Sequence, residues 1–267
     1  GAGKSMLAKR LPTIMPDMSF EEKLETTKVY SIAGRIPKGT ALIDERPFRS
    51  PHYTVSAQAL AGGGTTIKPG EISLAHNGVL FMDEFPEFDR RAKESLRQPI
   101  EDGIVNISRA GGSVTYPSNI MMICAMNPCP CGFFGHPTKE CKCTPAAKKR
   151  YLDKISGPIL DRIDIHIEVT PVAYDQLSDK AKGESSEVIK KRVDKARAVQ
   201  RERFKGTGIT CNAKMTPQMT KDFCLLSDDA NELLKVSFEK LGMSARAYDK
   251  ILRIARTIAD LDSSENI

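Results

Sequence analysis

Residues 79–84 read Val-Leu-Phe-Met-Asp-Glu (VLFMDE), four apolar residues followed directly by two acids. A short continuous apolar run is typical of a strand buried inside a parallel sheet, and such strands end at a cleft where polar groups can act. In a nucleotide-hydrolysing protein, Asp83 would hold Mg²⁺ and Glu84 would polarise the attacking water. The alternative is a strand that simply ends in solvated acids.

Residues 3–5 read Gly-Lys-Ser and precede a helical pattern. They match the second half of a phosphate-binding loop: Gly3 lets the backbone approach the phosphates, Lys4 reaches the outer phosphates, and the Ser5 hydroxyl binds Mg²⁺. Alone, this tripeptide fits an ordinary turn before a helix equally well, but the acidic strand end downstream favours the phosphate-binding interpretation. The first glycine of the full motif would lie before residue 1, so we expect this chain to bind ATP weakly or not at all.

Two further strands are predicted, at residues 119–127 (NIMMICAMN) and 163–169 (IDIHIEV). Adjacent parallel strands end at the same edge of a sheet, so Asn127 should lie beside Asp83 and Glu84. There its amide would bond the attacking water or the γ-phosphate. The alternative for an asparagine at a strand end is a turn former.

Two arginines complete the candidate site. Arg162 directly precedes the strand predicted at 163–169. It is a candidate arginine finger for the ATP of a neighbouring subunit, and the alternative is a surface ion pair with Asp161 or Asp164. Arg246 lies in the first turn of a predicted helix, where the macrodipole disfavours a cation. A solvated helix face is the alternative for Arg246.

Strands alternate with helices as far as about residue 170, and the pattern beyond is helical only. The sequence therefore predicts an α/β fold with a parallel sheet, followed by a small all-helical domain. Residues 35–78, rich in Gly and Pro, are expected to be irregular. The predicted boundaries are 1–183 for the α/β domain, with an insertion at 44–78, a hairpin at 104–116 and a Cys-rich loop at 128–144; 184–214 for a connecting helix and linker; and 215–267 for the helical lid domain.

Helix ends are marked by capping signals. Ser19 and Glu22 form a capping box, so a helix should begin after Ser19 and end at Gly34. A helix after residue 88 is expected to stop at Pro99 and Gly103. In the C-terminal part, the predicted N-caps are Thr216, Ser227 and Ser244.

Four of the seven cysteines, Cys129, Cys131, Cys141 and Cys143, are spaced C-x-C-x9-C-x-C. Four thiolates arranged as two pairs can close a tetrahedral structural Zn²⁺ site, which would stabilise a loop with too few apolar residues to fold alone. His136 could replace one sulfur. Free thiols or a redox pair are the alternatives.

The net charge of +6 permits a polyanionic partner such as nucleic acid without requiring one. No stretch approaches the roughly 20 apolar residues of a membrane span, so no membrane partner is expected. The odd number and the clustering of the cysteines argue against a disulfide framework. A reducing, cytoplasmic location is therefore expected.

Several stretches together resemble the magnesium-chelatase-like AAA+ ATPases of the YifB/ComM type. They are RPFRSPHYTVS (46–56), KPGEISLAHNGVLFMDEF (68–85), RQPIEDGIVNISRA (97–110), MNPCPCG (126–132) and ISGPILDRIDIHIEV (155–169). The resemblance covers essentially the whole chain and implies an AAA+ P-loop sheet with a helical lid, a hexameric ring, and ATP and Mg²⁺ as cofactors. The roles it implies are Walker A for Gly3, Lys4 and Ser5, Walker B for Asp83 and Glu84, sensor 1 for Asn127, the arginine finger for Arg162 and sensor 2 for Arg246.

The resemblance also carries expectations about surfaces and domains. The insertion at 44–78 and the hairpin at 104–116 look like pore-facing insertions, whose Lys68 and Arg109 would contact DNA phosphates. Charged loop residues without that role are the alternative, because +6 spread over the chain is no basic stripe. In that family a Lon-protease-like domain precedes the ATPase module. Nothing here matches it, so we expect this chain to be the ATPase core alone.

The function implied is an ATP-driven motor that remodels DNA, by branch migration or helicase action, in recombination or natural transformation. One alternative is a metal-chelatase-type motor subunit acting on a partner protein. Another is a nucleotide-dependent assembly protein with little turnover, which Glu84 and Arg162 argue against because a pure switch needs neither.

Overall fold

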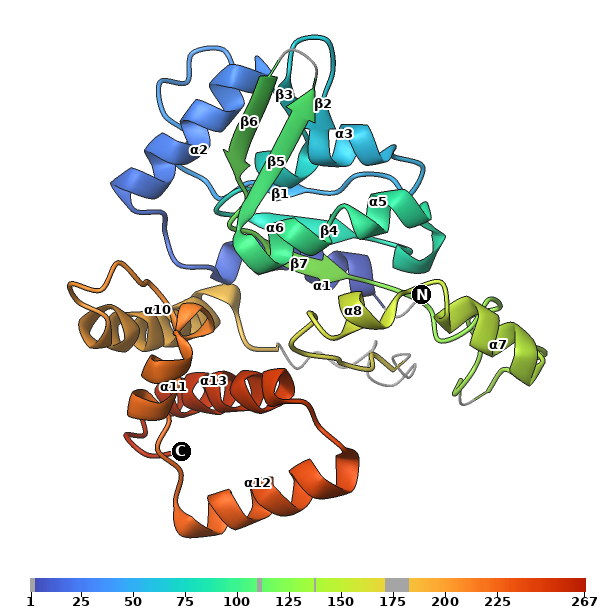
Figure 1. The fold of residues 1–267 in the computed structure, drawn as a ribbon, viewed down its shortest axis with the longest axis vertical. Coiled ribbons are helices and arrows are strands. Elements are labelled where there is room, and N and C mark those ends of the chain that lie inside the picture. Colours follow the sequence, from blue (N-terminus) through green and yellow to red (C-terminus); the bar gives the residue numbers. More distant parts are fainter. Residues whose placement is uncertain (1–2, 110–111, 137, 171–182) are drawn as a thin grey trace. The chain divides into compact units, whose positions relative to one another are not determined.

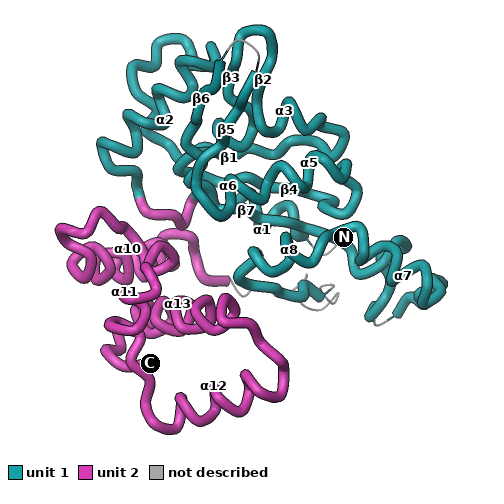
Figure 2. The backbone as a smooth tube through the Cα atoms, in the orientation of Figure 1, with its two compact units in different colours: residues 1–12, 17–181 teal, residues 13–16, 182–267 magenta. Residues whose placement is uncertain are grey.

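The computed structural model describes residues 3–109, 112–136, 138–170 and 183–267. The chain divides into two compact units, residues 1–12 with 17–181 and residues 13–16 with 182–267 (Figure 2).

The first unit is built on a three-stranded parallel sheet in the order β1-β4-β7 (Figure 1). Its strands are β1 (Phe48–Arg49), β4 (Val79–Met82) and β7 (Met121–Cys124). All four residues of the central strand β4 are buried, as expected for a strand covered on both faces. The predicted α/β class with a parallel sheet is therefore confirmed.

One strand of this sheet was predicted at the wrong place. Residues 163–169 form no strand, and Ile165 and Ile167 are 65% and 79% exposed. A strand is stable only where a neighbouring strand accepts its backbone hydrogen bonds, and this segment has no such ladder partner in the described part of the chain. The third strand is instead β1, which pairs with β4 from within the region predicted to be irregular.

Helices surround the sheet of the first unit. They are α1 (Lys4–Arg10), α2 (Phe20–Ala33), α3 (Ala57–Ala61), α4 (Glu71–Leu74), α5 (Arg90–Glu94), α6 (Arg97–Asp102), α7 (Pro145–Leu152) and α8 (Gly157–Leu160). Ala92 and Leu96 join Leu80 and Met82 of the sheet in the main core cluster. Gly103 ends α6 in the left-handed conformation, as predicted, but Pro99 does not stop the helix. It lies in the first turn of α6, where a missing N–H costs nothing.

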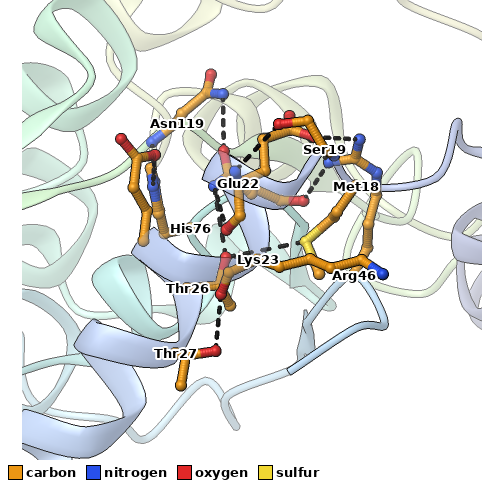
Figure 3. Close-up of polar contacts among 11 residues, drawn as sticks. Met18, Ser19, Glu22, Lys23, Thr26, Thr27, Arg46, His76 and Asn119 are labelled. Carbon is orange, nitrogen blue, oxygen red and sulfur yellow. Dashed lines mark hydrogen bonds and ion pairs between the residues drawn. The ribbon is translucent and has the colours of Figure 1, made fainter. Parts of the chain in front are cut away.

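The helix α2 is held by polar contacts at the entrance to β4 and β7 (Figure 3). Ser19 and Glu22 form the predicted capping box. Arg46 donates to Glu22 at 3.0 Å and to the Asn77 carbonyl at 2.7 Å. The buried His76 accepts at Nδ1 from the Asn119 N–H at 3.0 Å, which gives this histidine a structural role.

Two hairpins pack together away from the sheet. The pair β2 (Gly62–Gly63) and β3 (Lys68–Pro69) belongs to the predicted insertion, and β5 (Ile104–Arg109) and β6 (Gly112–Pro117) form the predicted hairpin. Tyr116 donates its hydroxyl to the Ile67 carbonyl at 3.0 Å. A Cβ at Gly62 would come within 2.7 Å of Ile107, so only glycine permits this close approach. The two hairpins are separate two-stranded sheets that pack against each other (Figure 1).

The second unit is helical throughout its described residues, as predicted. It contains α10 (Ser186–Arg203), α11 (Pro217–Phe223), α12 (Asp228–Leu241) and α13 (Ala245–Leu261). The predicted N-caps Thr216, Ser227 and Ser244 each accept a backbone N–H. A separate core forms around Phe204, Met215, Cys224 and Leu252. No helix among the described residues is long and apolar enough to cross a bilayer.

Candidate functional site

The candidate site lies where β4 and β7 end. The Ala125 N–H donates to the Met82 carbonyl at 3.0 Å, and the Phe85 N–H donates to the Ala125 carbonyl at 3.0 Å. These bonds continue the ladder beyond the strands. They place Asp83 and Glu84 next to the segment that leads into Asn127.

Both candidate side chains of the phosphate-binding loop reach this edge. Gly3 adopts a left-handed conformation with φ 72°, and α1 begins at Lys4. The Ser5 hydroxyl donates to Asp83 Oδ2 at 2.6 Å. The Lys4 ammonium donates to Asn127 Oδ1 at 3.0 Å and to the Met126 carbonyl at 2.6 Å. Side chains predicted from three separate motifs therefore meet at one place.

Glu84 has an unusual backbone. Its φ of 54° and ψ of 43° are left-handed, which is uncommon for a residue with a side chain. Its N–H donates to Asp83 Oδ1 at 3.0 Å, and its own side chain is exposed. A strained conformation at a polar strand end is a feature that clusters at functional sites.

This arrangement suits a phosphate-bound divalent cation. Hydroxyl and carboxylate oxygens are the ligands that Mg²⁺ prefers, and the Ser5–Asp83 pair offers one of each. The adjacent Lys4 supplies the positive charge that phosphate oxygens need.

Arg162 lies outside this cluster in its own chain. It follows α8, donates to the Pro158 carbonyl at 2.7 Å and pairs with Glu101 at the end of α6. Its side chain is only 16% exposed. Arg246 lies in the first turn of α13, in the second unit, so its role as sensor 2 stays a prediction.

Lys68 and Arg109, predicted from two different insertions, are both exposed and close together. Lys68 on β3 pairs with Gly63 on β2. A Cβ at Gly63 would lie 3.1 Å from Arg109 Nη2, so the Arg109 guanidinium rests against this strand. The packing of the hairpins therefore joins the two basic side chains in one surface.

The four cysteines converge. The Sγ atoms of Cys129, Cys131, Cys141 and Cys143 all lie within 4.8 Å of one another, and all are free thiols. Burial opposes ionisation of Cys129, but the N–H groups of Phe134 and Gly132 and the neighbouring thiols outweigh it and lower the pKa of Cys129 to about 6. This cluster could hold a metal ion.

His136 does not replace a sulfur in the cluster. Its Nδ1 accepts from the N–H groups of Thr138 and Lys139, each at 3.2 Å. The ring is therefore used to shape the turn within the loop, and the four thiols form the ligand set without it.

Two residues near Asn127 escaped the sequence analysis. Tyr151 on α7 is buried, and this burial raises the pKa of the Tyr151 hydroxyl. A hydrogen bond with the backbone of Asn127 offsets part of that increase. A Cβ at Gly132 would lie 3.8 Å from Asn127 Cγ, so this glycine backs onto the asparagine side chain. Gly132 belongs to the MNPCPCG stretch, so its place close to Asn127 in the sequence could have indicated this contact. Nothing in the sequence singles out Tyr151.

Comparisons with known proteins identify the family to which the chain is similar. The family model described as magnesium chelatase, subunit ChlI, matches residues 1–177, and the model of the ChlI C-terminal region matches residues 183–267. The chain is 43% identical over 270 residues to YifB of Salmonella typhimurium, covering 100% of this chain and 52% of that protein. It is 41% identical over 268 residues to the competence protein ComM of Haemophilus influenzae, covering 100% of this chain and 51% of that protein.

A less similar relative is named as a magnesium-chelatase subunit. The magnesium-chelatase 67 kDa subunit of Heliobacterium mobile is 31% identical over 147 residues, covering 53% of this chain and 20% of that protein. The chain spans about half the length of YifB and ComM.

Proposed function

Because the chain belongs to the magnesium chelatase ChlI family, with YifB and ComM as relatives over its full length, we propose that it is the ATP-hydrolysing core of an AAA+ motor. The observation that carries this proposal is the contact between the two nucleotide motifs. Ser5 donates to Asp83 while Lys4 donates to Asn127. If residues 3–5 were an ordinary turn and Asp83 and Glu84 were merely solvated acids, these contacts would not be expected.

Each residue of the cluster has a proposed role. Lys4 binds the outer phosphates, Ser5 and Asp83 hold Mg²⁺, and Glu84 polarises the attacking water. Asn127 hydrogen-bonds that water or the γ-phosphate. When bound, Mg²⁺ neutralises charge on the transferred phosphoryl group.

We assign the remaining predicted parts on the same footing. The α/β domain spans 1–183, a connecting helix and linker 184–214, and a lid 215–267. The motor works as a hexameric ring in the cytoplasm, in which Arg162 serves the ATP of a neighbouring subunit and Arg246 acts as sensor 2. For cofactors we propose ATP and Mg²⁺, with a structural Zn²⁺ in the four-cysteine cluster, because thiolates favour Zn²⁺ over Mg²⁺.

We propose DNA as the substrate on which the motor acts, by branch migration during recombination or natural transformation. Two observations support this. The full-chain relative ComM is a competence protein, and the exposed side chains of Lys68 and Arg109 share one surface. A chelatase-type motor acting on a partner protein is the second candidate, favoured by the similarity to a magnesium-chelatase subunit.

The test is an ATPase assay on the whole protein with forked DNA, four-way DNA or no DNA, at several salt concentrations. Stimulation by branched DNA that falls steeply with salt supports the DNA motor. Turnover that ignores DNA but responds to a partner protein supports the chelatase-type motor. Nucleotide binding with negligible turnover under all conditions would instead identify an assembly protein.

A further inference from the structure

The four-cysteine loop, residues 128–144, follows the nucleotide cluster at one end and leads into α7 at the other. Asn127 immediately precedes it, and Cys129 lies two residues after Asn127. At the other end, Thr144 caps α7 by accepting the Ala147 N–H at 3.2 Å. Whatever closes this loop therefore also fixes the chain on either side of it.

Three of the four sulfurs have the spacing of a tetrahedral metal site, and Cys143 Sγ lies within 4.8 Å of each of them. A Zn–S bond of ~2.3 Å places the sulfurs of a tetrahedron about 3.8 Å apart. In the structure Cys129 Sγ lies 3.4 Å from Cys131 Sγ and 3.7 Å from Cys141 Sγ, and Cys131 Sγ lies 3.7 Å from Cys141 Sγ. The S–S bond of a disulfide is far shorter, about 2.05 Å.

The loop has little else to hold it. Cys129 is its one buried residue among those described, while Phe133 and Phe134 are 36% and 52% exposed. A segment without an apolar core needs a cross-link to keep one conformation, and metal binding supplies that free energy in small sites.

Asn127 is contacted by the loop and by α7, the helix that follows the loop. Gly132, whose N–H donates to the Cys129 carbonyl at 3.0 Å, backs onto the Asn127 side chain. Tyr151, at the end of α7, faces the Asn127 backbone. Asn127 in turn accepts from Lys4 at 3.0 Å. A continuous path of contacts thus runs from the thiols to the phosphate-binding lysine.

We propose that the four cysteines bind one Zn²⁺ and that this ion, by closing the loop, holds Asn127 in position beside Lys4. The metal is a structural brace of the nucleotide site, remote from the reacting atoms. The metal assignment stands on the sulfur geometry alone, whereas the bracing of Asn127 rests on the proposed ATPase function.

The first measurement is the metal content of the whole protein, purified without added metal. We expect about one zinc per chain, lost in Cys141→Ser and retained in the control Cys211→Ser, which removes a free thiol of the helical unit. After removal of zinc by a chelator, added Co²⁺ should give the charge-transfer absorption of thiolate coordination. Less than about half an equivalent of zinc, together with no such spectrum, would overturn the metal site.

The second measurement separates bracing of Asn127 from a general loss of structure. Cys141→Ser should lower kcat by about tenfold, as disturbing an outer shell does elsewhere. In an Asn127→Ala background the same cysteine substitution should have little further effect, because the residue it positions is already gone. Equal losses in both backgrounds would show that the metal acts only on folding. Refilling of the stripped protein with Zn²⁺ gives the same comparison without a substitution.

The two proposals fail in different ways. A protein with zinc but no ATPase activity in any condition would refute the proposed function and leave the metal site intact. A protein that hydrolyses ATP equally well with and without zinc would refute the brace and leave the proposed function intact.

Discussion

Among the described residues, Glu84 shares a left-handed backbone only with Asn77 and Ser263 of the residues other than glycine. A left-handed backbone at a residue with a side chain costs about 1 kcal/mol, and Glu84 adopts it at the end of a fully buried strand. We predict that Glu84→Gln lowers kcat by at least about 100-fold while ATP affinity stays within a few-fold, because the amide keeps the shape but cannot polarise water. Turnover and nucleotide affinity measured on the same preparation test this.

The matched control is Glu87→Gln, which removes an exposed acid three positions away that pairs with Lys154. It should leave turnover unchanged, since a half-exposed surface pair contributes little. Unchanged hydrolysis in Glu84→Gln would show that the Walker B assignment is wrong.

At this scale, much of the site could be predicted from sequence. The rule that parallel strands end at a common edge placed Asn127 beside Asp83, and the motif at residues 3–5 assigned Lys4 and Ser5 to the same site. The structure brings these side chains together, whereas their roles in nucleotide binding and hydrolysis stay a prediction. The partner of Arg162 could not be predicted. Its ion pair is with Glu101, distant in sequence, and only the packing of α6 against α8 creates it.

Among the elements, the paired hairpins carry the predicted DNA contacts. Replacing Lys68 and Arg109 by Ala should weaken binding of four-way DNA and lower the slope of log K against log salt by about 2, one for each phosphate contact. The control is Lys235→Ala with Lys240→Ala, which removes the same charge from the exposed side of α12. Binding measured at several salt concentrations should change in the hairpin variant and not in the control. An equal loss of DNA affinity in the hairpin variant and in the control would show that binding depends only on net charge.

The helix α13 is anchored by a buried carboxylate. Asp260 has a fully buried side chain, pairs with Arg203 at 2.5 Å and Arg256 at 3.1 Å, and accepts from Asn212 at 2.7 Å. Removing this carboxylate leaves the positive charges of two buried guanidinium groups without their counter-charge. We expect Asp260→Ala to lower the free energy of unfolding by ~3 kcal/mol, measured by urea denaturation. The exposed Glu239→Gln should change it by less than about 0.5 kcal/mol.

The same carboxylate predicts a pH dependence. Burial favours the neutral form, but the hydrogen bonds and charges of Arg203, Asn212 and Arg256 outweigh it and hold the pKa of Asp260 below its usual value. A lowered pKa stabilises the fold above the unfolded-state pKa of about 3.9, and this contribution is lost as the pH falls through the lower folded-state value. The stability difference between the wild type and Asp260→Asn should therefore be constant near neutral pH and shrink below about pH 4. A difference that instead widened on acidification would contradict the assignment.

Helix ends could be predicted because they depend on residues that are neighbours in the chain. A strand could not be predicted reliably because it depends on a partner strand elsewhere in the chain. Caps at Ser19, Thr216, Ser227 and Ser244 were correct because a hydroxyl and a following N–H are neighbours in the chain. The strand predicted at 163–169 was wrong because alternation shows only that a segment can be a strand. Whether it becomes one depends on a partner strand, and the described part of the chain pairs no strand with this segment.

For the whole molecule, the sequence indicated the class of fold, a parallel α/β unit and a helical unit, and each unit has its own core. The sequence could not show whether subunits share a site. That question falls on Arg162, whose described contacts, Glu101 and Pro158, lie outside the cluster of Lys4 and Asp83. If it serves a neighbouring subunit, two inactive variants should complement each other.

Glu84→Gln subunits retain the finger, and Arg162→Ala subunits retain the catalytic acid. In rings formed from equal amounts of both, about a quarter of the interfaces combine an intact Glu84 with an intact Arg162 from the next subunit. Mixing should therefore restore up to about a quarter of the wild-type ATPase activity, although each variant alone is nearly inactive. The matched control mixes Glu84→Gln subunits with subunits that carry both Glu84→Gln and Arg162→Ala. No interface in this mixture has an intact Glu84, so no activity should return. Mixtures as inactive as that control would place the action of Arg162 within its own chain, where its pairing with Glu101 would then be its whole role.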